Sequence, residues 1–232
     1  MKKPESTLLK FAIIGTLIVF AMAAVSYLFF REPEAPSTDL PEVQESASQP
    51  VVAGDATAFV IDAEQSEVRF TLGELLGGEP TTVIGDSDNL SGTIYFSADA
   101  PQDAEISEIV INARDLETDN SFRNRAIQNQ ILETSSYEYI RFMPTSISGL
   151  PGSVAVSATA NLEITGNLTI KETTREVTFS GQVTVVSETQ LDGHAETMVA
   201  YADYGIFIPN APRVADVDEE VLLEIDFVAL AE

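Results

Sequence analysis

Hydrophobic and polar residues alternate along most of the chain beyond residue 58, most clearly between Ile164 and Phe179. Between residues 162 and 170 every second position is apolar or glycine, and the positions between them are polar. After a polar break at Lys171 to Glu176, the same alternation resumes from Val177 to Val185. A period of two residues is typical of a strand that buries one face. We therefore expect an antiparallel hairpin, whose turn type stays open because the break contains no Asn-Gly or Asp-Gly pair.

Further short alternating segments, each bounded by glycine, proline, aspartate or asparagine, predict strands through the rest of this region. They are Phe59–Ile61, Val68–Leu72, Thr82–Ile84, Gly92–Ser97, Ile106–Ala113, Tyr139–Phe142, Glu196–Tyr201 and Val221–Phe227. Turn signals at this spacing favour an all-β sandwich or barrel.

One stretch breaks the strand pattern. Residues 122–132 (FRNRAIQNQIL) place Ile127 and Ile131 four positions apart among good helix formers, and residues 119–121 offer an N-cap. We expect one short helix here.

The N-terminal part of the chain has a different character. Residues 11–30 carry no charge, and such a run is long enough to cross ~30 Å of hydrocarbon as a helix. Lysines precede the run and carboxylates follow it, so the positive-inside rule predicts a single transmembrane anchor with residues 1–10 in the cytoplasm. A cleaved signal peptide is the alternative, since Ala21, Met22 and Ala23 form an A-x-A triplet, but cleavage there would leave an apolar new N-terminus.

The segment that follows, residues 31–57, is rich in proline, glutamate and serine. This composition predicts a disordered tether. Residues 58–232 then form one folded domain.

Composition and charge exclude several classes of function. The chain of 232 residues has 37 acidic and 12 basic residues and a formal net charge of −25, which argues against a nucleic-acid partner. It has no cysteine, which excludes thiol nucleophiles, disulfides and thiolate metal sites.

Candidates for catalysis and metal binding are poor. The only histidine, His194, lies in a polar stretch that looks like a hairpin loop, with no sign of a catalytic triad around it. The acidic turns near Asp86 and Asp216 lack the spacing and the bidentate glutamate of an EF-hand calcium loop. We therefore expect no catalytic residue, no enzyme activity and no metal site.

Four further segments accompany the hairpin sequence ITGNLTIKETTREVTF. They are FVIDAEQSEVRF (59–70), SGTIYFS (91–97), RNRAIQNQILETSSYEYIRF (123–142) and YADYGIFIP (201–209). In this order and spacing, the five segments resemble the motifs of the YceI-like family of polyisoprenoid-binding proteins, over about residues 59–228. The chain departs from the family's pattern at Gln65, where histidine is frequent, at Glu138, where proline is usual, and at Tyr204, where phenylalanine is usual.

The resemblance implies an eight-stranded antiparallel lipocalin-like barrel with one short helix, enclosing an elongated apolar cavity for an isoprenoid chain. A barrel of about this size holds a small ligand only where inward side chains leave room. The candidate cavity wall consists of Val68, Phe70, Leu72, Ile94, Phe96, Ile109, Ile111, Ile127, Ile131, Phe142, Leu168, Ile170, Val177, Phe179, Leu223, Ile225 and Phe227. The sequence leaves open whether these side chains surround a ligand or fill a closed core.

Four polar residues near the predicted helix are candidates for contact with a ligand headgroup. Arg123 and Arg125 lie at the start of the helix, where positive charge opposes the helix dipole and calls for an anionic partner. That partner is either a neighbouring carboxylate or a polar headgroup such as a phosphate. Tyr137 and Tyr139 follow the helix and offer hydroxyl donors, with a structural role as the alternative.

Together these features predict a lipid-binding protein of the cell membrane, with a single span and the barrel in the periplasm or outside the cell. Its expected partners are the membrane, through the N-terminal helix, and an isoprenoid lipid or quinone. We expect no cofactor other than this bound lipid. An exposed sheet edge can pair with the edge of a second copy of the chain, so the sequence does not decide between a monomer and a homodimer. The alternative function is an interaction or stress-response module whose barrel is filled and holds no lipid.

Overall fold

The computed structural model describes Tyr27, residues 31–41 and residues 56–232. The predicted cytoplasmic segment 1–10, the predicted anchor 11–30 apart from Tyr27, and residues 42–55 of the predicted tether lie outside the described residues. None of the helices formed by the described residues has the length and hydropathy needed to cross a membrane.

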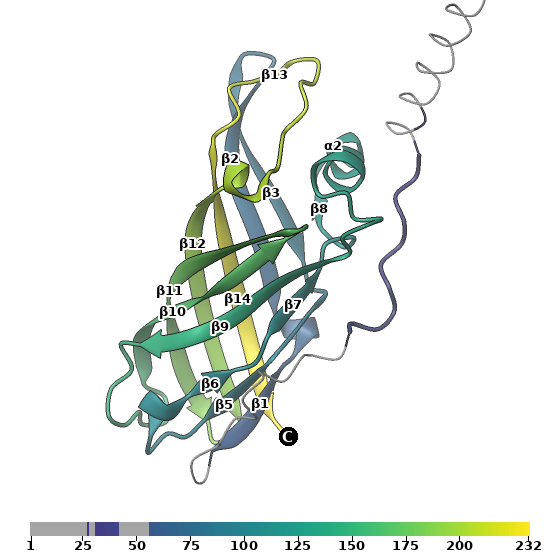
Figure 1. Ribbon diagram of the computed structural model, residues 1–232. Coiled ribbons are helices and arrows are strands. Elements are labelled where there is room, and N and C mark those ends of the chain that lie inside the picture. The colour runs from purple at the N-terminus through teal and green to yellow at the C-terminus, as the bar shows by residue number, and fades with distance from the viewer. Residues whose placement is uncertain (1–26, 28–30, 42–55) are drawn as a thin grey trace, which may run out of the picture.

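The strands of the described residues form one antiparallel sheet (Figure 1). They are β1 (Thr57–Ile61), β2 (Glu67–Leu76), β3 (Glu79–Ser87), β4 (Leu90–Ser91), β5 (Thr93–Phe96), β6 (Glu105–Ile106), β7 (Ile109–Asn112), β8 (Glu117–Thr118), β9 (Tyr139–Ser148), β10 (Thr159–Ile170), β11 (Thr173–Ser187), β12 (Gln190–Ala200), β13 (Val214–Ala215) and β14 (Glu220–Ala231). Neighbouring strands follow the order β4-β7-β9-β10-β11-β12-β14-β1-β5-β6, while β2 branches from β14 and pairs also with β3 and β13.

The sheet curls into a half-barrel, and its strand count corrects our expectation of eight. The described residues form 14 strands because bends divide single runs of extended chain. The clearest case is the run from β3 to β4: β3 pairs with β2 on one side, whereas β4, only two residues later in the chain, pairs with β7 at the other edge of the sheet. This switch of partner curls the two edges toward each other.

The predicted hairpin is confirmed as the pair β10 and β11. Its strands pair continuously from Thr159 with Thr184 to Ile170 with Thr173, so only residues 171–172 form the turn. Lys171 has a φ of 56° and makes the reversal without glycine. Three pairs of threonine hydroxyls lie 2.8 Å apart on the outer face, from Thr159 to Thr184, Thr165 to Thr178 and Thr169 to Thr174.

The predicted helix is also present, in two parts. The α-helix α2 (Ser121–Ala126) continues into a π-helical turn, η3 (Ile127–Ile131). The side chain of Asn120 caps α2 by accepting hydrogen bonds from the backbone N–H groups of Phe122 and Arg123. Three short 3₁₀ helices, η1 (Ala63–Gln65), η2 (Pro101–Asp103) and η4 (Tyr201–Tyr204), complete the described helices.

The two ends of the half-barrel differ. One end, here called the helical end, carries α2, η3, η4 and the tip of the β2–β3 hairpin (Figure 1). Arg123 of α2 pairs with Glu74 of β2, and β13 pairs with Leu75 and Leu76, so the parts of this end are joined. At the opposite end the rings of Phe59 and Phe96 pack edge to face at 6.4 Å.

Residues 31–37, here called the strap, lie against the half-barrel beside η3. The Arg31 Nε group donates a hydrogen bond to Asn129 Oδ1 (3.2 Å), and Asn129 Nδ2 donates one to the Arg31 carbonyl (3.0 Å). Arg114 forms an ion pair with Glu34 (2.9 Å). The backbone N–H of Ser37 donates to Glu138 Oε1 (2.8 Å). Burial acts to raise the pKa of Glu138, but the bonds from Ser37 and Asn112 and the charge of Arg114 hold it below its ordinary value. Residues 31–37 of the predicted tether thus bond to polar groups of η3 and of the segments that follow β7 and precede β9.

Candidate functional site

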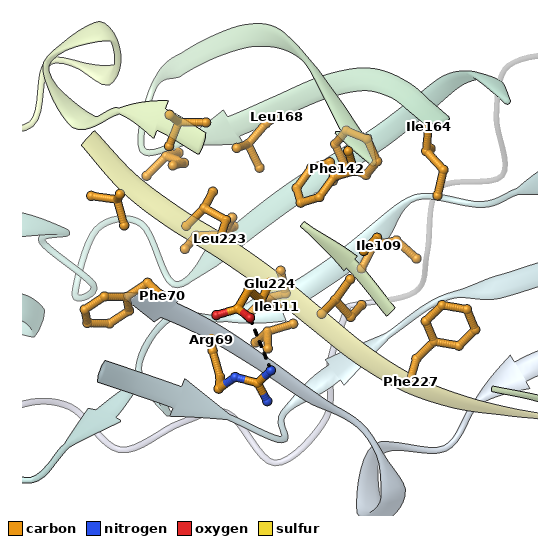
Figure 2. Close-up of a pocket in the computed structure, with 18 of the residues that line it drawn as sticks. Arg69, Phe70, Ile109, Ile111, Phe142, Ile164, Leu168, Leu223, Glu224 and Phe227 are labelled. Carbon is orange, nitrogen blue, oxygen red and sulfur yellow. Dashed lines mark ion pairs between the residues drawn. The ribbon is translucent and has the colours of Figure 1, made fainter. Parts of the chain in front are cut away.

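The half-barrel encloses an apolar cavity of about 300 Å³. Its wall comes from the sheet strands, and η3, η4 and residues 206 and 208 line it at the helical end. The cavity therefore extends along the half-barrel to the helical end. Figure 2 shows Phe142, Leu168, Leu223 and Phe227 among the side chains around it.

The structure places the predicted wall residues along this cavity, with Val177 as the exception. Those that border it are Val68, Phe70, Leu72, Ile94, Phe96, Ile109, Ile111, Ile127, Ile131, Phe142, Leu168, Ile170, Phe179, Leu223, Ile225 and Phe227. Val177 packs against the core instead. It pairs with Gly166, over which the ring of Phe142 lies, so the ring occupies this part of the wall.

Glycines in the wall explain why the cavity stays hollow. A Cβ atom built on Gly85 would lie 2.3 Å from the ring of Phe70, one on Gly166 would lie 2.7 Å from that of Phe142, and one on Gly193 would lie 2.3 Å from that of Phe227. Each ring therefore lies flat over a glycine of the adjacent strand instead of projecting inward. Phe142 also packs edge to face on Phe179 at 4.9 Å, which holds both rings at the wall.

Of the four headgroup candidates, only Arg123 borders the cavity. Its guanidinium pairs with Glu74 at 2.9 Å and with Asp119 at 2.6 Å. The side chain of Glu74 is buried, so this pair is held away from solvent. The anionic partner that the sequence called for is thus supplied by neighbouring carboxylates.

The other three candidates point elsewhere. Arg125 lies over the ring of Phe122 at 5.8 Å, and Arg141 lies over the ring of Tyr139 at 5.7 Å. The Tyr137 hydroxyl donates to Glu172 at 2.6 Å, and this bond raises the pKa of Tyr137. Tyr139 alternates along β9 with Ile140 and Phe142, which border the cavity, and so it lies on the outer face.

Tyr204 is a polar wall residue that our site prediction missed. It is 2% exposed and borders the cavity, and its hydroxyl has no hydrogen-bond partner among the described residues. Burial raises its pKa to about 12, with Arg175 acting to lower it and Asp203 to raise it. The one signal in the sequence was the departure from the usual phenylalanine at this position.

A polar cluster lies on β2, β12 and β14. Its residues Arg69, His194 and Glu224 border the cavity, and Figure 2 shows the ion pair between Arg69 and Glu224. His194 lies in β12 and not in a loop, and its Nδ1 atom is 2.8 Å from Asp226 Oδ1. Burial acts to raise the pKa of Asp226, but hydrogen bonds from His194 and Arg69 hold it below its ordinary value.

Ligand atoms of His194, Glu196 and Glu224 lie within 4.8 Å of one another, close enough to hold a metal ion. Arg69 lies 3.6 Å from Glu224 and already supplies positive charge there. The cluster is therefore explained as an ion-pair network.

Comparison with known proteins agrees with this geometry. The pattern of the YceI-like domain family matches residues 59–229. No curated protein sequence matches the chain.

Solved structures share the fold at low sequence identity. A polyisoprenoid-binding domain from Saccharophagus degradans, implicated in plant cell wall breakdown, has a TM-score of 0.59 at 17% identity, over 76% of this chain and 99% of its own. BcnA from Burkholderia cenocepacia has a TM-score of 0.58 at 15% identity, over 72% of this chain and 98% of its own. The YceI protein of Campylobacter jejuni has a TM-score of 0.52 at 14% identity, over 64% of this chain and 84% of its own.

Proposed function

Because the chain belongs to the YceI-like family, we propose that it is a membrane-tethered extracytoplasmic carrier or store for an isoprenoid lipid. The hollow apolar cavity is the observation that carries the proposal. An aliphatic chain gains about 0.8 kcal/mol for each CH₂ group that it buries. A wall of this composition therefore favours a hydrocarbon chain.

The size of the cavity limits how much of the ligand it holds. About 300 Å³ is at the lower end of the range for ligand pockets, roughly 300–1,000 Å³. A quinone tail or polyprenyl chain longer than this volume extends past the wall, and the helical end, built from short helices and a loop, is where it would emerge. The name of the similar domain from Saccharophagus degradans supports the same ligand class.

The uncharged run at residues 11–30 supports the membrane tether and the placement of the half-barrel outside the cytoplasm. We propose no other cofactor and no catalytic role. The hollow cavity also favours the carrier over the filled-barrel alternative.

The test is the lipid content of the protein. Residues 51–232, which retain every described strand, would be purified without detergent and extracted into organic solvent. We expect mass spectrometry to find one prenyl lipid per protein molecule. No lipid after purification, together with no uptake of added quinone, would contradict the proposal.

A matched pair of variants ties the result to the cavity. Leu223 borders the cavity, whereas its neighbour Leu222 does not. Leu223→Trp should fill the cavity and lower the lipid content, and Leu222→Trp should leave it unchanged. Equal lipid content in both variants would place the ligand outside the cavity.

A further inference from the structure

Two phenylalanines at the helical end are unusually exposed. Phe122 in α2 is 71% exposed, and Phe207 in the segment after η4 is 72% exposed. Their chain neighbours Arg123, Ile206 and Ile208 border the cavity. A single exposed apolar side chain needs no explanation. Two exposed aromatic rings beside residues that border an apolar cavity form a surface that water solvates poorly.

Arginines without a carboxylate partner gather at the same end. Of the eight basic residues beyond residue 50, Arg125, Arg175 and Arg213 form no ion pair with the described residues. Arg125 lies over Phe122, Arg175 lies near Tyr204, and the Arg213 carbonyl accepts from Gly77 at the tip of the β2–β3 hairpin. In a chain of charge −25, these three cations lie at an end that also carries exposed carboxylates such as Asp203 and Asp216. They form no ion pair with them, so their guanidinium groups are available for phosphate.

The strap ties this end to the proposed anchor. The uncharged run ends at residue 30, and the next residue, Arg31, is bonded in both directions to Asn129 of η3. Consecutive Cα atoms are about 3.8 Å apart, so the chain reaches the half-barrel directly after the run. Asn129 lies seven positions after Phe122, which is roughly 10 Å along a helix. The helical end is thus the part of the domain held nearest to the predicted point of membrane exit.

We propose that the helical end docks on the phospholipid bilayer in which the chain is anchored, and that the isoprenoid enters the cavity there. Phe122 and Phe207 lie in the interface between headgroups and acyl chains, a region that aromatic side chains favour. Arg125, Arg175 and Arg213 face the phosphates and offset the repulsion expected from the acidic surface. This inference rests on the membrane-tethered function proposed above and adds the orientation of the domain.

The absence of tryptophan from the sequence permits a direct test. The full chain would be reconstituted into phosphatidylcholine vesicles with brominated acyl chains, carrying one tryptophan as Phe122→Trp, Phe207→Trp or Val156→Trp. Val156 is exposed and lies in the loop between β9 and β10, outside the helical end. We expect blue-shifted and quenched emission at positions 122 and 207, and unquenched emission at position 156.

The outcomes separate this inference from the proposed function. Vesicle flotation with unquenched emission at positions 122 and 207 would overturn the docking, even if prenyl lipid is extracted from the protein. Quenching at both positions without any prenyl lipid would support the docking and reject the lipid-carrier function. A chain that fails to float with the vesicles would reject the tether and the docking together.

The strap supplies a second variant. Asn129→Leu removes both hydrogen bonds to Arg31 without touching the phenylalanines. We expect it to weaken the quenching at position 122 while flotation is unchanged. Undiminished quenching would show that the strap does not set the orientation.

Discussion

The hydroxyl of Tyr204 is a buried, unpaired polar group in a wall that is mostly apolar. A buried hydroxyl without a partner loses its hydrogen bonds to water and gains none in return. Phenylalanine would fill the same space without that loss. Tyrosine at this position therefore costs stability as long as the cavity is empty.

This cost gives a signed prediction for Tyr204→Phe. The substitution should raise the free energy of unfolding of the lipid-free protein by about 1 kcal/mol, because an unpaired buried hydroxyl is replaced by hydrogen. Urea denaturation of lipid-free wild type and variant measures the difference. Tyr201→Phe, at a half-exposed position of the same short helix, is the control and should change little. A less stable Tyr204→Phe variant would mean that the hydroxyl has a partner.

The sequence predicted apolar wall residues better than polar contacts. Alternation depends only on which face of a strand is buried, and it placed residues such as Leu168, Phe179 and Ile225 on the inner face correctly. Polar contacts depend on which chain segments meet. Glu74 lies far from Arg123 in the sequence, so no local pattern indicated that the two would form a pair.

At the level of strands, the pairing of aromatic rings with glycines shapes the cavity. Phe227 of β14 pairs with Gly193 of β12, and Phe70 of β2 pairs with Gly85 of β3. A glycine within a strand normally weakens it, since it contributes no side chain to packing. Here each glycine instead leaves space in which the aromatic ring of the paired residue packs against the cavity wall.

Gly193→Ala tests this arrangement. The new methyl group would lie 2.3 Å from the Phe227 ring, so the ring must move inward. We expect a loss of stability of about 1–3 kcal/mol and a lower prenyl-lipid content. Gly152→Ala is the matched control, because a Cβ atom there meets nothing within 4 Å. Equal stability and lipid content in the two variants would show that the ring does not depend on the glycine.

The predicted helix illustrates what a sequence pattern misses at this scale. Its location and its cap follow from the residues around Asn120. The π-helical turn does not, since a widened turn reflects tertiary contacts. The buried side chain of Gln128, which donates to the Arg114 carbonyl, is one such contact.

For the whole molecule, the dominant electrostatic feature is its net charge of −25. Ion pairs such as those of Arg69 and Arg123 use only a fraction of the carboxylates. The remaining negative charges repel one another in the folded state more than in the expanded chain.

Added salt should therefore stabilise the protein. Raising sodium chloride from about 0.01 M to 0.15 M shortens the screening length from about 30 Å to about 8 Å. We expect the melting temperature to rise over this range, as measured by circular dichroism. Potassium chloride should act equally, because the effect is general screening. A falling melting temperature would mean that ion pairs contribute more than the repulsion.

The overall curl of the sheet could be predicted only through the family resemblance. The strands themselves follow from local alternation, but the partner switch between β3 and β4 joins segments that no local pattern relates. The contacts of the strap were missed for a similar reason. A segment rich in proline and glutamate was predicted as disordered from its composition, whereas the polar groups that hold it lie about 80 to 100 residues further along the chain.

The threonine pairs along β10 and β11 have a consequence for how the chain folds. A hairpin with a two-residue turn closes a small loop, so its entropic cost is low before other strands are in place. A register slip of one residue would turn the apolar face outward and separate all three pairs of hydroxyls. The outer threonines therefore penalise a misaligned hairpin early in folding, before the later strands of the sheet add to it.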